Sequence, residues 1–71
     1  MSEEMIYLTE DGARKLREEL EELVNVKRAE LAARLRDAIS MGDLSENADY
    51  HVAKEQQAFV EGRIQQIEYL L

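Results

Sequence analysis

The sequence predicts an all-α protein, a long antiparallel two-helix hairpin that forms an intramolecular coiled coil. Three observations support this fold. The 71 residues include no proline and only three glycines, and of these Gly42 alone lies between two long periodic segments. Apolar residues recur at steps of three, four and seven on both sides of Gly42. Two one-sided helices joined by a few residues bury their apolar faces by lying antiparallel, stripe against stripe.

The first helix is expected over about residues 10–41. Thr9 is a suitable N-cap, and Glu10 and Asp11 place negative charge beside the exposed amides of the first turn. With a gap at Lys27 and Arg28, the apolar stripe runs through Leu16, Leu20, Leu23, Val24, Leu31, Leu35, Ala38 and Ile39. Opposite charges four residues apart favour a solvated outer face; they are Arg14 with Glu18, Lys15 with Glu19, Arg17 with Glu21 and Glu30 with Arg34.

The second helix is expected over about residues 46–71, and the tip between the helices over about residues 42–46. The apolar stripe of the second helix, interrupted at Gln56, consists of Val52, Phe59, Val60, Ile64, Ile67, Leu70 and Leu71. A first helix of about 30 residues at 1.5 Å per residue gives a hairpin on the order of 45 Å long. Residues 1–71 therefore form a single domain whose remote end is the sequence "GDLSEN".

The opposite end of the hairpin carries apolar residues that the two helices do not need for packing. The last residues, "IQQIEYLL", remain in helical register without a residue that ends a helix, and "MIYL" at positions 5–8 is expected beside them. We expect this end to pack against a further domain that the sequence lacks.

The tip admits two interpretations from its residue types alone. Gly42 suits the left-handed position after a helix, and Asp43 to Glu46 has the spacing of a capping box, with Ser45 as a competing N-cap. Alternatively, Asp43, Glu46 and Asp49 bind a cation. Mg²⁺ prefers oxygen ligands and is commonly held by one or two carboxylates together with substrate phosphates. Two acids alone bind it weakly, so the tip is not a self-sufficient active site.

Other catalytic constellations are missing. The absence of cysteine excludes disulfides and thiolate metal sites, and there is no glycine-rich phosphate loop. The single histidine, His51, has no evident catalytic partner; Tyr50 is interpreted as a packing residue that shapes the tip, and Lys54 as a solvated cation. A net charge of -7 opposes autonomous binding to a phosphate backbone. No apolar run is long enough for a membrane span, which predicts a soluble, cytoplasmic protein without a membrane partner.

Three segments together resemble one known family. "YLTEDGARKLREELEEL", "GDLSENADYHVAKEQQ" and "EGRIQQIEYLL" are similar to the N-terminal coiled-coil domain of the GreA/GreB family of bacterial transcript cleavage factors. The resemblance covers nearly the whole chain, and the run from Gly42 to Gln57 is its most specific part. It implies a transcription elongation factor whose hairpin enters the secondary channel of a backtracked RNA polymerase. The polymerase then cleaves its own RNA, so the factor is an accessory and not an enzyme.

The resemblance also assigns roles to residues. Asp43 and Glu46 match the two acids that help hold the second Mg²⁺ of the polymerase active site, and Lys54 matches a basic position that contacts the RNA 3′ segment. Asp49 matches a further acidic position. Gly42, Ser45, Asn47, Asp49 and Tyr50 are expected to shape the tip.

Two alternatives remain. One is a related channel-blocking inhibitor with the same hairpin. Inhibitors of that kind carry a more heavily acidic tip, so the simple "GDLSEN" tip argues against this alternative. The other is a purely structural coiled-coil module. Family members continue into a C-terminal domain that grips the polymerase, and nothing in the 71 residues matches that domain. The affinity of the hairpin for the polymerase is therefore expected to depend on the missing domain.

Overall fold

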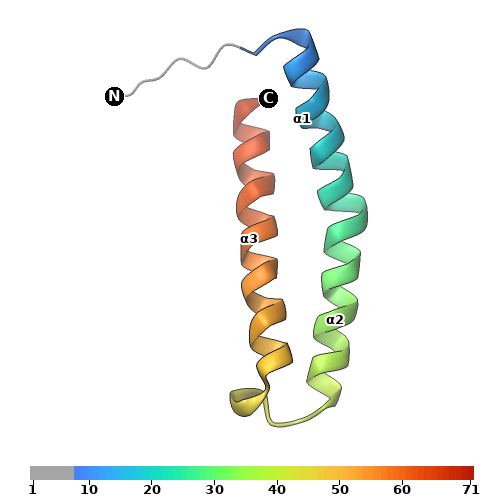
Figure 1. Ribbon diagram of the computed structural model, residues 1–71, viewed down its shortest axis with the longest axis vertical. Helices are drawn as coiled ribbons and strands as arrows, with labels where there is room; N and C mark the ends of the chain where they lie inside the picture. Colours follow the sequence, from blue (N-terminus) through green and yellow to red (C-terminus); the bar gives the residue numbers. More distant parts are fainter. Residues whose placement is uncertain (1–7) are drawn as a thin grey trace, which may run out of the picture.

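The computed structural model describes residues 8–71 and confirms the predicted hairpin (Figure 1). The first arm is continuous through α1 (Glu10–Glu22), a π-helical turn (Leu23–Lys27) and α2 (Arg28–Ser40). A short 3₁₀ turn (Leu44–Glu46) leads to α3 (Ala48–Leu70), which forms the second arm and packs against all three parts of the first. The longest dimension is 47 Å, close to the length expected from the sequence. Of the apolar segment at positions 5–8, residues 5–7 lie outside the described part.

The first arm begins at the predicted cap. The Thr9 side chain accepts a hydrogen bond from the backbone amide of Gly12 at 2.9 Å, and the Thr9 carbonyl accepts one from Ala13 at 2.9 Å. Because these bonds satisfy amides that have no partner within the helix, α1 starts at Glu10.

The π-helical turn corrects the register of the first arm. Continuing the repeat of four and three from Leu23 would bring Lys27, Glu30 and Arg34 to the interface. A π-helical turn accommodates one extra residue. The inward positions consequently move on by one, so that Leu31 and Ala38 are buried beyond the turn. The gap in the stripe at Lys27 and Arg28 was the sequence signal for this turn.

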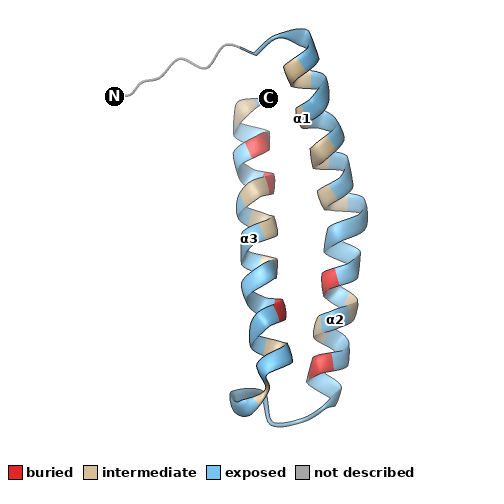
Figure 2. Cartoon of the chain, viewed as in Figure 1, coloured by how far each residue is buried: buried red, intermediate tan, exposed pale blue. Residues whose placement is uncertain are grey.

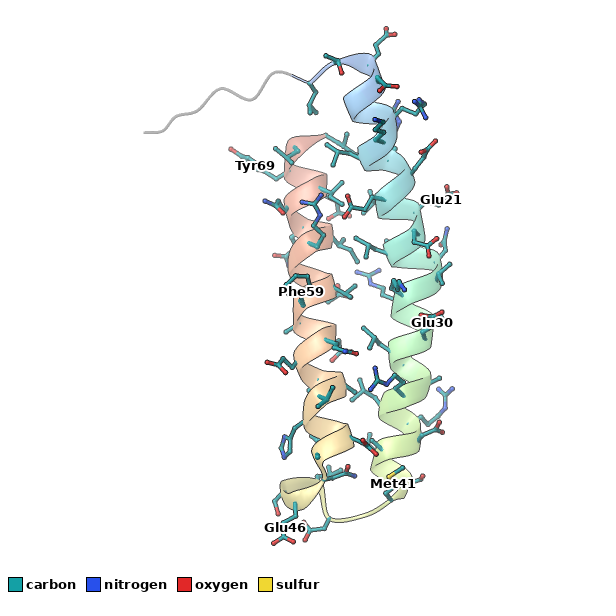
Figure 3. The ribbon with its side chains drawn as sticks, in the orientation of Figure 1. Glu21, Glu30, Met41, Glu46, Phe59 and Tyr69 are labelled. Atoms are coloured by element: carbon teal, nitrogen blue, oxygen red, sulfur yellow. The ribbon has the colours of Figure 1, made fainter. Side chains whose placement is uncertain are left out.

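The seam of α3 differs in part from the predicted stripe. Its inward residues follow steps of four and three, and they are Ala53, Gln57, Val60, Ile64 and Ile67. Ala53 and Ile67 are fully buried, whereas Phe59 is 80% exposed. Figure 2 shows the buried residues of α3 in red on the side that faces the first arm, and Figure 3 shows Phe59 on α3. The prediction that Val52, Phe59 and Leu71 line the interface is therefore wrong, and so is the same prediction for Ile39 in the first arm. Ala53 and Gln57 occupy seam positions that the predicted apolar stripe did not include.

Polar side chains join the two arms on the flanks of the seam. Arg63 forms a two-point ion pair with Glu19, and Arg28 forms one with Glu61 at 2.7 Å for both contacts. Each arginine lowers the pKa of its glutamate by hydrogen bonding to the carboxylate. The predicted pair of Arg14 with Glu18 is confirmed at 3.1 Å.

The other predicted pairs within the first arm do not form in the structure. Glu19 pairs with Arg63 and not with Lys15, and Lys15 lies 3.6 Å from Asp11. Arg34 bonds to Gln56 of α3, and Glu30 approaches Lys27 at 3.8 Å. Glu19 and Arg34 therefore bond to the opposite arm, whereas Lys15 and Glu30 pair within their own arm. Within residues 8–71, no helix is both long enough and apolar enough to cross a membrane.

Candidate functional site at the hairpin tip

The tip begins where the backbone ends α2. The amides of Met41 and Gly42 donate to the carbonyls of Ala38 and Ile39, at 3.1 and 3.2 Å. Gly42 has a φ of 96°, in the left-handed region that favours glycine, as the sequence predicted. The chain therefore leaves the helix sharply, and the residues that follow project beyond the end of the first arm.

The side chain of Asp43 closes the turn that follows Gly42. Its Oδ1 atom accepts hydrogen bonds from the Ser45 amide at 3.2 Å and from the Ser45 hydroxyl at 2.8 Å. The Glu46 amide donates to the Asp43 carbonyl at 3.3 Å. These contacts make a turn closed by the aspartate side chain and not the capping box that the spacing suggested, since Oδ1 binds the amide two residues on and not three.

The cap of the second helix is Asn47. Its Oδ1 atom accepts from the Tyr50 amide at 3.1 Å, and α3 starts at Ala48, two residues later than expected. The assignment of Ser45 as the competing N-cap is therefore wrong. Asn47 was visible as a cap in the sequence, because asparagine is among the best N-cap residues and Asp49 follows in the first turn.

Three acidic residues line one shallow hollow of about 340 Å³ on the tip. Asp43 comes from the turn, Glu46 from the 3₁₀ segment and Asp49 from the first turn of α3. Figure 3 shows Glu46 at the extreme end of the molecule, and Met41 across the tip from it at the end of the first arm. The hollow is completed by Met41, Gly42, Asn47 and Ala48. All three acids are exposed, so their oxygen atoms are accessible from outside.

The charge at this hollow is uncompensated. In the described part of the chain, none of the ion pairs involves Asp43, Glu46 or Asp49. Exposed carboxylate oxygens without cationic partners attract a cation, and hard cations such as Mg²⁺ prefer oxygen ligands. Yet residues 8–71 hold no group of three or more acidic, histidine or cysteine side chains close enough to bind an ion. Within this part of the chain, the tip acids therefore do not form a complete metal site by themselves.

Three further side chains lie just behind the acids on α3. Tyr50 is half-buried, and its ring meets the His51 ring edge to face at 5.5 Å. The Nε2 atom of His51 lies 3.3 Å from the Ser45 carbonyl, which places His51 against the back of the tip turn. Lys54 is exposed and bonds to Gln57 at 3.2 Å. Lys54 thus lies along the arm and outside the acidic hollow, so its role in contacting RNA remains a prediction.

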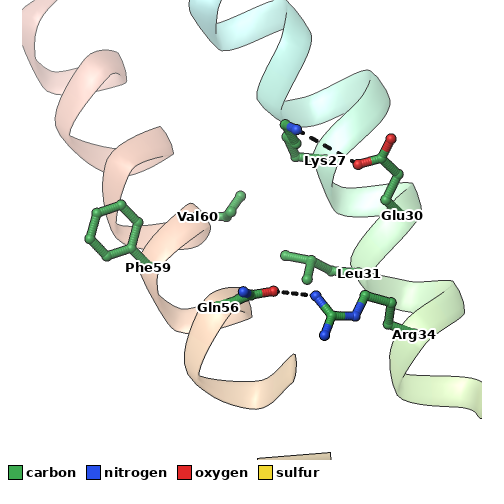
Figure 4. A pocket seen from close by; sticks show the side chains of 7 residues that line it. All are labelled: Lys27, Glu30, Leu31, Arg34, Gln56, Phe59 and Val60. Carbon is green, nitrogen blue, oxygen red and sulfur yellow. Dashed lines mark hydrogen bonds and ion pairs between the residues drawn. The ribbon is translucent and has the colours of Figure 1, made fainter. Parts of the chain in front are cut away.

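A second hollow lies midway along the hairpin (Figure 4). It is lined by Lys27, Glu30, Leu31, Arg34, Gln56, Phe59 and Val60. Its cations already have partners, because Arg34 donates to Gln56 at 2.6 Å and Lys27 lies 3.8 Å from Glu30. This surface lacks the concentration of one charge that distinguishes the tip.

Comparison with known proteins identifies the family. A family model described as "Transcription elongation factor, N-terminal", for GreA and GreB, matches residues 6–71. The chain belongs to the GreA/GreB N-terminal domain family.

Curated relatives agree with this assignment. The transcription elongation factor GreA of Buchnera aphidicola is 56% identical, over 90% of the chain and 40% of the relative. That of Acetivibrio thermocellus is 52% identical, over 93% and 42%, and that of Bacillus cereus strain AH187 is 51% identical, over 100% and 46%. The chain thus spans less than half the length of these GreA proteins.

Proposed function

We propose that this GreA-type hairpin enters the secondary channel of bacterial RNA polymerase and stimulates the polymerase's own cleavage of backtracked RNA. The observation that carries the proposal is the acidic hollow at the end of a 47 Å hairpin. A narrow arm whose tip groups three exposed carboxylates around one hollow delivers ligands into a deep site that the bulk of a protein does not reach. Relatives named transcription elongation factors support this reading.

In this proposal Asp43 and Glu46 supply oxygen ligands to a Mg²⁺ ion shared with the polymerase. The Oδ2 atom of Asp43 is suited to this, because Oδ1 alone holds the turn through Ser45. A second Mg²⁺ stabilises charge on an attacking or leaving oxygen in phosphodiester hydrolysis. The hairpin residues bind and orient, and Lys54 contacts the RNA 3′ segment. The chain is accordingly an accessory factor and not an enzyme, and it acts in the cytoplasm with the polymerase.

The remaining region of the GreA relatives is proposed to supply most of the affinity for polymerase. When one binding region is tethered to another, the second engages at a high effective concentration. The 71-residue chain is therefore expected to stimulate cleavage at higher concentration than a chain extended by that region.

The test is a stalled, backtracked elongation complex with labelled RNA. Wild type should shorten the RNA, and Asp43→Asn and Glu46→Gln should each remove the stimulation, since they keep size and hydrogen bonding but lose the charge. Glu22→Gln is the matched control, because Glu22 is an exposed acid far from the tip. Block of RNA synthesis by wild type would instead indicate an inhibitor, no effect would indicate a structural module, and full cleavage with a neutral tip would disprove the metal role.

A further inference from the structure

The side chain of Asn47 uses its two polar ends on different arms of the hairpin. Its Oδ1 atom caps α3 by accepting from the Tyr50 amide, while its Nδ2 atom donates to the Ala38 carbonyl of α2 at 2.7 Å. The second bond is part-buried and spans nine residues. One side chain therefore fixes the start of one helix and ties it to the end of the other.

The hydrogen bond from Asn47 to the Ala38 carbonyl and a backbone hydrogen bond from Gly42 together hold the two ends of the tip. The Gly42 amide is anchored on the Ile39 carbonyl, and Asn47 is anchored on the adjacent Ala38 carbonyl. Residues 43–46, which include both tip acids, lie between these two anchors. The entry and the exit of the acidic turn are thus held by neighbouring carbonyls in the last turn of α2.

We propose that Asn47 is the positioning residue of the tip, and that its bond to Ala38 holds Asp43 and Glu46 in the arrangement that RNA cleavage requires. This inference rests on the proposed function. Mg²⁺ demands near-octahedral geometry, so ligands on a loose turn bind it poorly. Groups held in place before binding avoid the entropy of ordering them in the complex.

The choice of asparagine separates the two roles of this side chain. Aspartate is an equally good N-cap, and its charge is favourable at a helix N-terminus. It has no N–H, however, and in the Asn47→Asp variant a carboxylate oxygen faces the Ala38 carbonyl. That carbonyl keeps its bond from the Met41 amide, so it is not left unpaired. Asn47→Asp therefore removes the bond across the tip and leaves the helix cap intact.

The first test uses the free protein and needs no polymerase. Circular dichroism should show equal helicity for wild type and Asn47→Asp. Amide hydrogen exchange by NMR should be faster in Asn47→Asp by about tenfold at Ser45 and Glu46, with little change in the middle of α3. Unchanged exchange at the tip would overturn the proposal. Asn47→Ser, which keeps a capping oxygen but lacks the amide N–H that reaches Ala38, is the second variant and should show the same faster exchange; normal exchange at the tip of Asn47→Ser would also contradict the proposal.

The second test measures RNA cleavage as a function of Mg²⁺ for wild type, Asn47→Asp and Asp43→Asn. Asn47→Asp should require about tenfold more Mg²⁺ for half-maximal stimulation, and the hairpin concentration for half-maximal effect should stay the same. Equal Mg²⁺ requirements for Asn47→Asp and wild type would refute positioning. An inactive wild type would refute the proposed function instead, and the exchange measurement then decides separately whether Asn47 holds the tip.

Discussion

The guanidinium of Arg63 donates two hydrogen bonds to the carboxylate of Glu19, at 2.7 and 2.8 Å, and joins α3 to α1 across 44 residues of sequence. Arg28 and Glu61 form a similar pair from the first arm to α3. Bidentate geometry makes these pairs stronger than ordinary surface contacts. Since both pairs fix the sliding of one arm along the other, they support the register that the seam sets.

These pairs make the hairpin's stability depend on pH. Hydrogen bonds from the arginines lower the pKa values of Glu19 and Glu61 in the folded state. Their contribution is therefore complete above the unfolded glutamate pKa of about 4.3, and it is lost as the pH falls through the lower folded values. We expect Arg28→Gln/Arg63→Gln to melt below wild type at pH 7, and the difference to vanish near pH 2.

The comparison between wild type and this double variant is essential, because acidification also neutralises repelling acids in a chain of net charge -7. Thermal melts followed by circular dichroism at several pH values provide both curves. A difference in melting temperature that persists unchanged at low pH would show that the arginines stabilise the hairpin by packing and not by ion pairing.

Alanine substitution is expected to affect stability very differently at two large apolar residues of α3. Ile67 is fully buried, so Ile67→Ala should lower the free energy of unfolding by about 2–5 kcal/mol. Phe59 is 80% exposed, so Phe59→Ala should change it by no more than about 0.5 kcal/mol. Urea denaturation of both variants measures this. A large loss for Phe59→Ala would place Phe59 in an interface, such as one between two copies of the chain.

The hairpin fold could be predicted because its apolar residues recur regularly at helical spacing. The residues that face the opposite arm could not all be predicted. Leu31 and Ile67 repeat with their neighbours at helical steps, and the single interior break at Gly42 leaves a hairpin as the one compact arrangement. Phe59 was misplaced because an apolar residue beside the seam has nearly the same spacing as one on it. The burial of Ala53 depends on the opposite arm coming close, which residue type alone does not reveal.

Two glycines respond differently to the same substitution. Gly42 has a φ of 96°, so Gly42→Ala should destabilise the hairpin by about 1–2 kcal/mol even though no atom lies within 4 Å of the added Cβ. Gly62 is within α3 and also has open space, so Gly62→Ala should stabilise by about 0.5–1 kcal/mol. Chemical denaturation of the two variants against wild type gives the signs. A neutral or stabilising Gly42→Ala would mean that the tip adopts another backbone conformation in solution.

The tip residues could be selected from the sequence, but their contacts could not. Asp43, Glu46 and Asp49 were chosen because acids recur there without neighbouring cations, and they do line one hollow. The bond from Asn47 to Ala38 joins residues nine apart across a turn, so no local spacing rule detects it. Capping motifs in a sequence describe a single helix end, whereas this hydrogen bond joins the end of α2 to the start of α3.

The last prediction concerns chemistry by the chain alone. Incubated with labelled RNA and millimolar Mg²⁺, the purified hairpin should leave the RNA intact. Asp43 and Glu46 supply too few ligands, because Mg²⁺ at such sites also needs substrate phosphates held in place, and residues 8–71 offer no larger group of metal-binding side chains. The net charge of -7 further repels RNA from the chain. Asp43→Asn is the control that distinguishes a contaminating nuclease, since contamination persists in the variant. Hydrolysis by wild type that disappears in Asp43→Asn would show that the tip is an active site in its own right, and an accessory role would then no longer explain its acids.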